Sequence, residues 1–411
     1  MQMRRVVVTG MGAVSPFGRG VECLMANLTA GQSAVTAVPE LARITGLRSW
    51  VAARVPGIDP KQIPRKFRRS MSSMSVFATL ASYDAIAQAG LTPEACTSGD
   101  LGVVIGSTIG PTQVIEEFFR DFFTDRSLER MRSTLFFQIM NHSCATNVAQ
   151  ALDITGRILA PAAACSTGCQ AVGYGYELIA MGKQEFLLCG GADEFHPLSA
   201  ATFDVMTAAS TRYNDCPRRT PRPFDHDRDG VVCGEGSGIL LLESLESARR
   251  RGARILAEVL GFATVTDPIS IANPGAESMA TCMQKALLDG GLAPGDIDYV
   301  NAHATATLQG DPAECEAILR VFGDGIPVSS LKGHLGHTMA ASGALELIAT
   351  VEMLNRGTLL PTLNLDAVDP SCAGVRHVRG VEAIPIQRAV KNSFALGGVN
   401  SSLIVGRYAY D

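Results

Sequence analysis

The stretch Ile158-Leu159-Ala160-Pro161-Ala162-Ala163-Ala164-Cys165-Ser166-Thr167-Gly168-Cys169-Gln170 runs from apolar residues through small residues into a helix-like segment. Such a strand–turn–helix unit is typical of α/β folds. A thiol at this turn lies at the positive end of the helix dipole, which favours the thiolate, and backbone N–H groups there can stabilise an oxyanion. Cys165 is therefore a candidate nucleophile, although a buried structural cysteine is the commoner case; Cys169 is assigned to packing.

The same alternation of strand and helix continues along the chain and predicts an α/β fold with largely buried sheets. A charged segment near residues 243–254 suggests a boundary between residues 1–250 and 251–411, without a flexible linker. A charged and aromatic segment, residues 118–132, suggests a surface or subunit-contact excursion. Strands are predicted at residues 6–9, 101–105, 186–189 and 239–242, and helices at residues 72–89, 170–181, 278–288 and 344–354.

Composition excludes several classes of protein. Of 411 residues, 46% are hydrophobic and 18% charged, which suits a large core, and the net charge of −5 does not favour nucleic-acid binding. No apolar run of about 18 residues predicts a membrane span, and residues 1–10 lack a signal-peptide layout. The odd number of cysteines, 11, without a dense framework or a zinc spacing, indicates free thiols in a reducing cytoplasm.

Residues 9–16 (TGMGAVSP) invite comparison with a dinucleotide-binding loop. That interpretation is rejected, because Ser15 stands at the third glycine position and Pro16 falls where the phosphate-binding helix should run. A strand that leaves the sheet through a tight turn is expected instead.

A cysteine nucleophile needs polar partners, and two of the seven histidines are the best candidates. His303 lies in residues 298–307 (DYVNAHATAT), and His337 lies in residues 329–337 (SSLKGHLGH). Both segments come after apolar strands, so each histidine is expected at a strand end that faces a cleft. The other five, His142, His196, His226, His334 and His377, are interpreted as core or surface residues.

Taken together, these segments resemble the β-ketoacyl-[acyl-carrier-protein] synthases, the decarboxylating condensing enzymes of the thiolase superfamily. The cysteine with two histidines is similar to the elongating class, type I or II, of these synthases. The resemblance implies a thiolase-like fold of two pseudo-symmetric halves in an αβαβα arrangement. It covers nearly the whole chain and rests on the two histidine segments and on residues 6–15 (VVVTGMGAVS), 164–168 (ACSTG), 222–225 (RPFD), 228–230 (RDG), 234–236 (GEG) and 392–400 (NSFALGGVN).

The resemblance implies a role for each matching residue. Cys165 would take the acyl chain from a phosphopantetheine thioester, and His303 and His337 would stabilise the enolate formed when malonyl thioester loses carbon dioxide. The backbone N–H groups of Cys165 and Leu396 would form the oxyanion hole. Lys332 paired with Glu346 would organise the site, although an ordinary salt bridge is the alternative. Asp311 and Glu314 would hold the catalytic loop, and Thr305, Thr307, Phe394, Leu396 and Ile109 would contact the substrate or its pantetheine arm.

The implied partner is an acidic acyl carrier protein, for which Lys66 and Arg69 match docking positions on an otherwise acidic chain. A solvated helix start is an equally good interpretation of each residue alone. A homodimer is expected, or a heterodimer with a homologue that resembles a chain-length factor. No metal, organic cofactor, nucleic acid or membrane is implied, because the carrier protein delivers the phosphopantetheine.

Four positions depart from the family pattern. Ala304, Ala306 and Ala395 replace glycines, and Leu396 replaces a gating phenylalanine. These changes suggest a secondary-metabolite pathway, such as a polyene or polyketide, as an alternative to ordinary fatty-acid elongation. Two rival functions fit the sequence less well. A thiolase using coenzyme A would need a second catalytic cysteine, for which only Cys372 is available, and a non-catalytic chain-length subunit would lack the nucleophile.

Overall fold

A computed structural model describes residues 3–271 and 273–409. Its principal sheet has the strand order β12-β11-β10-β13-β14-β9-β1-β8-β7-β5-β6, with β2 (Gly18–Arg19) also paired to β1. Strand β1 (Val6–Ser15) pairs with β8 along most of its length and with β9 only over Val6–Val8. The sheet therefore consists of two parts that are joined at one end of β1.

These two parts have the same topology. Leaving out the short strands β2 to β4 and β12, each part takes its strands in the chain order third, second, fourth, fifth, first. This repeat confirms the predicted pseudo-symmetry. The first part contains β1, β5 (Leu101–Gly106), β6 (Ile158–Leu159), β7 (Phe186–Asp193) and β8 (Gly236–Ser244), and the second β9 (Ala257–Thr266), β10 (Tyr299–Asn301), β11 (Pro327–Ser329), β13 (Arg388–Ala395) and β14 (Val399–Gly406), with β12 (Arg376–His377) at its edge.

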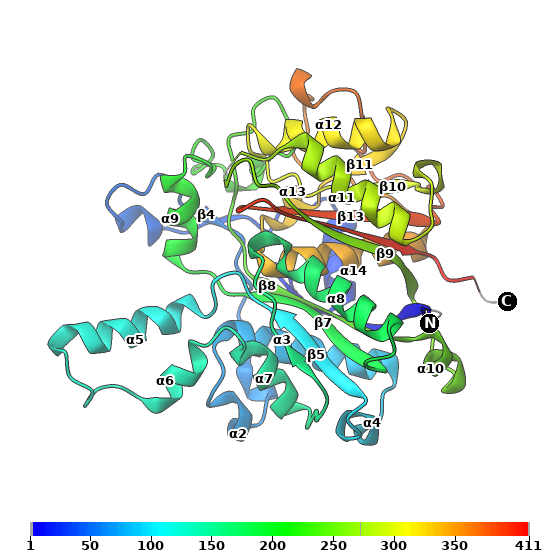
Figure 1. Ribbon diagram of the computed structural model, residues 1–411. Helices are drawn as coiled ribbons and strands as arrows, with labels where there is room; N and C mark the ends of the chain where they lie inside the picture. Colours follow the sequence, from blue (N-terminus) through cyan, green and yellow to red (C-terminus); the bar gives the residue numbers. More distant parts are fainter. Residues whose placement is uncertain (1–2, 272, 410–411) are drawn as a thin grey trace.

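Helices cover both parts of the sheet (Figure 1). Helices α8 (Thr167–Ala180) and α14 (Ala340–Arg356) pack against strands of both parts and form the central layer. The outer layers consist of α3 (Ser73–Ala89) with α7 (Ser143–Ala151) on the first part, and of α11 (Ala276–Asp289) with α12 (Gly310–Phe322) on the second. The predicted αβαβα arrangement is confirmed. Shorter helices are α1 (Val21–Thr29), α2 (Arg65–Arg68), α4 (Pro93–Thr97), α9 (Pro197–Val205), α10 (Leu245–Arg250) and α13 (Lys332–Leu335).

Glycines set the closest contacts between these layers. A Cβ at Gly12 on β1 would lie 1.9 Å from the Ala81 carbonyl oxygen of α3, so the glycines of residues 9–16 serve helix–strand packing. Strand β1 runs through to Ser15, past the turn expected there. In the central layer, a Cβ at Gly343 would lie 2.5 Å from the Cys169 backbone nitrogen. The first turns of α8 and α14 are therefore in contact.

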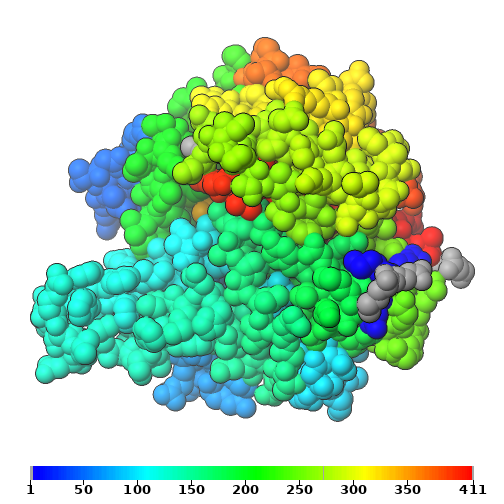
Figure 2. All heavy atoms as spheres, in the orientation of Figure 1, coloured from blue at the N-terminus to red at the C-terminus, as the bar shows by residue number. Residues whose placement is uncertain are grey.

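The predicted strands and helices are all present, most of them a few residues longer than predicted. The segment of residues 118–132 is a surface excursion: α5 (Thr112–Asp125) and α6 (Ser133–Gln138) project from the body as an arm (Figures 1 and 2). Phe119 and Phe123 on this arm are 46% and 56% exposed. All 11 cysteines are free. Within residues 3–271 and 273–409, no helix has the length and apolarity needed to span a bilayer.

Candidate active site

Cys165 lies in a short 3₁₀ turn, residues Ala164–Ser166, directly before α8. Ala164 has φ +46°, a left-handed conformation that alanine rarely adopts and that is often found at functional turns. The hydroxyl of Ser166 donates to the carbonyl oxygens of Ser393 (2.7 Å) and Val399 (2.8 Å) on β13 and β14. The turn that carries Cys165 in the first half is thus held by the second half.

The Cys165 thiol is 4% exposed, and this burial raises its pKa to about 12. The positive charge of Lys332 and the backbone N–H groups of Cys165 and Leu396 act in the opposite direction but do not outweigh burial. The expectation that the helix start favours the thiolate is therefore wrong for the resting site, because desolvation of the sulfur dominates. The contact with both N–H groups does fit the predicted oxyanion hole.

His303 comes after β10, as predicted for a strand end. Its backbone N–H and that of Ala304 donate to the two carboxylate oxygens of Glu314 on α12, at 2.8 and 2.7 Å. Glu314 is fully buried and also accepts from the Asn392 side chain. Glu314 therefore holds the loop that carries His303, as the resemblance implied.

The prediction that His337 lies at the end of a strand is wrong, because it comes after the short helix α13. Its backbone N–H donates to Val232, and its carbonyl oxygen accepts from Gly234, both at 2.8 Å. The rings of His303 and His337 are 5.3 Å apart between centroids and nearly perpendicular, at 85°. The side-chain ligand atoms of Cys165, His303 and His337 all lie within 4.8 Å of one another, which is also close enough to hold a metal ion.

Both imidazoles are available to a substrate. In the part of the chain that the structure describes, the Nδ1 atom of His303 and both ring nitrogens of His337 have no hydrogen-bond partner. Burial, followed by the positive charge of Lys332, lowers the pKa of each histidine well below its usual value. Both rings are consequently neutral near pH 7, and each can donate one N–H and accept one proton.

Behind the histidines lies a buried group of charges. The Lys332 ammonium is 2.7 Å from Glu346 Oε1 on α14, as predicted, and neither side chain is exposed. Glu346 Oε2 is 3.0 Å from the ammonium of a second buried lysine, Lys391 on β13. Lys391 is not among the residues predicted from the sequence. The feature of the sequence that could have revealed it is a lysine directly before the motif of residues 392–400, in a segment that otherwise resembles a buried strand.

A cavity of about 470 Å³ opens onto Cys165, His303 and His337. Four of the predicted substrate contacts line it, namely Thr305, Thr307, Phe394 and Leu396. Ile109 does not line it; it is 44% exposed on the segment before α5. That segment turns outward into the projecting arm, and a contact between Ile109 and the substrate stays a prediction.

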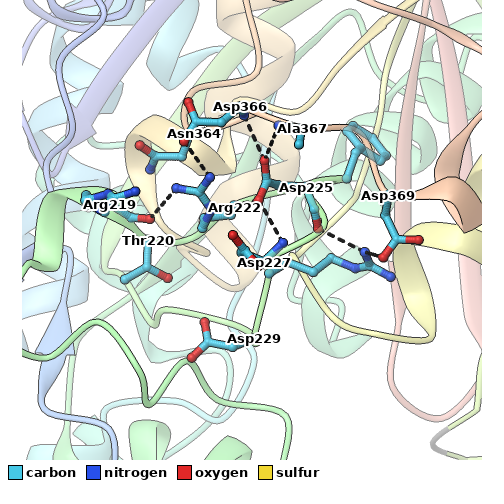
Figure 3. Close-up of polar contacts among 12 residues, drawn as sticks. Arg219, Thr220, Arg222, Asp225, Asp227, Asp229, Asn364, Asp366, Ala367 and Asp369 are labelled. Carbon is cyan, nitrogen blue, oxygen red and sulfur yellow. Dashed lines mark hydrogen bonds and ion pairs between the residues drawn. The ribbon is translucent and has the colours of Figure 1, made fainter.

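Figure 3 shows a network of polar contacts that includes Arg222, Asp225 and Asp369. The same network reaches the loop with Thr305 and Thr307 through Arg228. The buried Arg228 donates to the carbonyl oxygens of Thr307 (3.2 Å) and Leu308 (3.3 Å) and pairs with Asp369 at 2.6 Å. Asp311 is also fully buried and accepts from the Phe224 backbone N–H at 2.8 Å. Burial raises the pKa of Asp311 to about 7, with Arg228 opposing the change.

The predicted docking residues, Lys66 on α2 and Arg69 directly after it, are both exposed. The Lys66 ammonium lies 4.5 Å from the Phe67 ring centroid. Both side chains are therefore accessible to a partner.

Comparison with known proteins identifies the family. Residues 3–248 match the family described as "Beta-ketoacyl synthase, N-terminal domain", and residues 256–366 match "Beta-ketoacyl synthase, C-terminal domain". The chain belongs to the β-ketoacyl synthase family. The predicted resemblance is thereby confirmed.

Relatives match this synthase over nearly their full length. The 3-oxoacyl-[acyl-carrier-protein] synthase 1 of Haemophilus influenzae is 35% identical over 99% of this chain and 100% of its own. A β-ketoacyl synthase from Burkholderia phymatum is 44% identical, with a TM-score of 0.96 over 99% of this chain and 100% of its own. A ketosynthase structure described as a type II polyketide synthase acyl-carrier protein in complex with its ketosynthase is 31% identical, with a TM-score of 0.91 and coverage of 99% and 100%.

Cys372, the second cysteine that a thiolase would need, does not lie at the site. Cys372 is fully buried and is not among the residues that line the cavity. Its carbonyl oxygen contacts His377, and its side chain interacts with Cys315 on α12. Cys372 thus belongs to the core of the second half of this synthase.

Proposed function

We propose that this synthase condenses malonyl-[acyl-carrier-protein] with an acyl chain held on Cys165, with release of carbon dioxide. One observation carries the proposal: a thiol from the first half and two neutral imidazoles from the second half meet in one cavity. A chain-length subunit without a nucleophile would not need this arrangement.

In the loading step, Cys165 gives its proton to a neutral imidazole, because the buried thiol does not ionise unaided near pH 7. The thiolate attacks the acyl thioester, and the N–H groups of Cys165 and Leu396 stabilise the oxyanion. Collapse of this intermediate breaks the bond to the pantetheine sulfur. The pantetheine thiolate takes the proton back and leaves as a thiol.

In the condensing step, the malonyl thioester carbonyl accepts hydrogen bonds from the N–H groups of His303 and His337. These bonds stabilise the enolate as the bond to the carboxylate breaks and carbon dioxide leaves. The enolate carbon then attacks the acyl-Cys165 carbonyl. The tetrahedral intermediate expels the Cys165 thiolate, which takes up a proton from water, because its first proton left with the pantetheine thiol in the loading step.

The remaining residues support these two steps. Lys332 with Glu346 sets the electrostatic field, Glu314 and Asp311 hold the His303 loop, and Thr305 and Thr307 hydrogen-bond the pantetheine arm while Phe394 and Leu396 border it. Residues 1–250 and 251–411 are assigned to the two halves. The chemistry needs no metal or bound organic cofactor, since the carrier protein brings the phosphopantetheine. The free cysteines support a cytoplasmic location.

The assignment to a pathway rests on the cavity. Methyl groups narrow the space next to the backbone at three positions where the family usually has glycine, namely Ala304, Ala306 and Ala395. Leu396 replaces the usual phenylalanine with a smaller, non-aromatic side chain. Ala306 adopts φ +68°, a conformation in which glycine would be less strained. We assign the enzyme to a secondary pathway, polyene or polyketide, in which it works as a homodimer or with a chain-length partner.

The experiment is mass spectrometry of the purified protein after incubation with acyl-carrier thioesters of different length and unsaturation. A mass increase at Cys165, followed by a β-ketoacyl product when malonyl-carrier is added, is expected. Loading at another residue would overturn the proposal. Ordinary saturated chains as the preferred substrates would overturn only the assignment to a secondary pathway.

Docking is tested with the double variant Lys66→Glu/Arg69→Glu. Its KM for the carrier thioester should rise by about tenfold, since two attractive charges become repulsive. Loading from a small pantetheine thioester should be unchanged. Equal effects on both donors would remove these residues from the docking surface.

A further inference from the structure

Lys391 is, like Lys332, a fully buried lysine of the second half. It lies on β13, which pairs with β10 on one side and β14 on the other, and its side chain is fully buried. Lysine is disfavoured in strands and is almost never fully buried unless it is paired. A residue that breaks these local rules so completely is expected to serve a function.

The surroundings of the Lys391 ammonium are polar and specific. It donates to the Asn392 carbonyl oxygen, lies 3.4 Å from the Ser393 hydroxyl, and pairs with Glu346 Oε2 at 3.0 Å. Glu346 Oε1 is paired with Lys332 at 2.7 Å. The Glu346 carboxylate therefore lies between two ammonium groups and has one oxygen for each.

We propose that Lys391 is a positioning residue for the condensing step: its ammonium group holds one oxygen of Glu346, so that the other fixes Lys332, and it adds a second positive charge close to His303 and His337. This inference rests on the proposed condensing function. The contact with Lys391 is an ion pair and not a hydrogen bond, since Glu346 Oε2 has no hydrogen-bond partner among the described residues. The attraction still disfavours rotation of the carboxylate, so the Lys332 ammonium keeps its place when substrate enters.

The charge also acts on the histidines. After burial, the positive charges of Lys332 and Lys391 both contribute to the lowered pKa of His303 and of His337. The other titratable groups around Lys391 are Glu346 on α14, Glu314 on α12, Lys332 on α13 and Cys169 on α8. His303 and His337 line the cavity, as does Glu314, whose carboxylate oxygens already accept from the backbone N–H groups of His303 and Ala304. Lys391 therefore favours neutral imidazoles that donate hydrogen bonds to an enolate.

The same geometry separates the two chemical steps. The positive charge of Lys332 lowers the pKa of Cys165 against the larger effect of burial, whereas both lysines lower the pKa of His303 and of His337. Loss of the Lys391 charge should therefore reduce condensation, in which both histidines stabilise the enolate, more than acyl transfer to Cys165. A residue that only filled space would affect both steps equally or neither.

The test uses Lys391→Ala, Lys391→Met and the full-length wild type. In Lys391→Ala the rate of condensation should fall on the order of tenfold or more, while the rate of acyl loading on Cys165 should fall by clearly less. Ammonium chloride should restore condensation, because an ammonium ion fits the acceptors left by the lost amine, and sodium chloride at equal ionic strength should not. In Lys391→Met the acid limb of the condensation rate should move to higher pH, since the histidines become easier to protonate.

The control is Lys285→Met, which removes an exposed lysine of α11 and should change neither step. Condensation at the wild-type rate without ammonium would overturn the proposal, as would a loss in a folded variant that ammonium does not restore. A chain that cannot fold without Lys391 even in ammonium would assign the residue to core stability instead. Failure of the wild type to condense would overturn the proposed function itself.

Discussion

The two halves of this synthase share one scaffold but differ in the segment after the third strand. In the first half β6 leads into the Cys165 turn and α8, and in the second half β11 leads into Lys332, His337 and α14. The two central helices therefore present different chemistry at equivalent places. Their first turns touch through Gly168 and Gly343, which brings the nucleophile of one half to a histidine of the other.

A second difference lies after the second strand. After β10 the chain turns inward through His303 to α12, whereas after β5 it turns outward into the arm of α5 and α6 (Figure 1). One half thus contributes a second catalytic candidate and the other an exposed aromatic surface. The repeated fold therefore supplies the scaffold, and the residues proposed for the reaction lie on segments that differ between the two halves.

Removing the nucleophile should have the largest effect. Cys165→Ala should abolish acyl loading and reduce condensation by roughly a thousandfold or more, because no covalent intermediate forms. Mass spectrometry and a coupled rate assay measure the two effects. Cys169→Ala, one turn along α8, should load normally, and loading that survives in Cys165→Ala would contradict the assignment.

The histidines of the second half should matter next. His303→Ala and His337→Ala should each lower decarboxylative condensation by about 10²–10³-fold, since each removes one N–H donor from the enolate. Loading should fall less, because the remaining imidazole can still take the thiol proton. Rates of carbon dioxide release and of acyl transfer, measured separately, check this difference. Equal loss in both steps would indicate that the histidines serve only to ionise Cys165.

The contact between the halves can be disturbed without removing any of the proposed catalytic side chains. Gly343→Ala places a methyl group against the Cys169 backbone nitrogen, so unfolding free energy should fall by roughly 1–3 kcal/mol. Thermal or denaturant unfolding measures the change. Gly380→Ala is the matched control, because a Cβ there meets nothing within 4 Å. Equal stability of the two variants would show that the helices have room to separate.

The smallest expected effect concerns the resting thiol. Since burial raises the pKa of Cys165 to about 12, its thiolate fraction should rise tenfold per pH unit. Iodoacetamide alkylation, followed by peptide mass mapping, should therefore accelerate steadily between about pH 7 and 9. A plateau near pH 8 would mean that the free thiol ionises more easily than its burial allows.

Much of the fold could be predicted from the sequence. The strand and helix periodicities found the central elements, and the motifs around Cys165, His303 and His337 identified the family. The sequence did not predict that the segment with Ile109 turns away from the body, because a match to a family motif does not reveal the direction in which a loop turns. Lys391 was missed for a related reason: its partner Glu346 is distant in the chain and only packing of β13 against α14 joins them.

The amino-acid sequence by itself determined the α/β architecture and pointed to Cys165, His303 and His337 as candidates, because periodicity and short motifs can be recognised in consecutive residues. Only the tertiary structure decided the protonation of the site and the sharing of Glu346 by two lysines. Both depend on how far water is excluded and on which distant charges become neighbours, and folding alone sets these conditions.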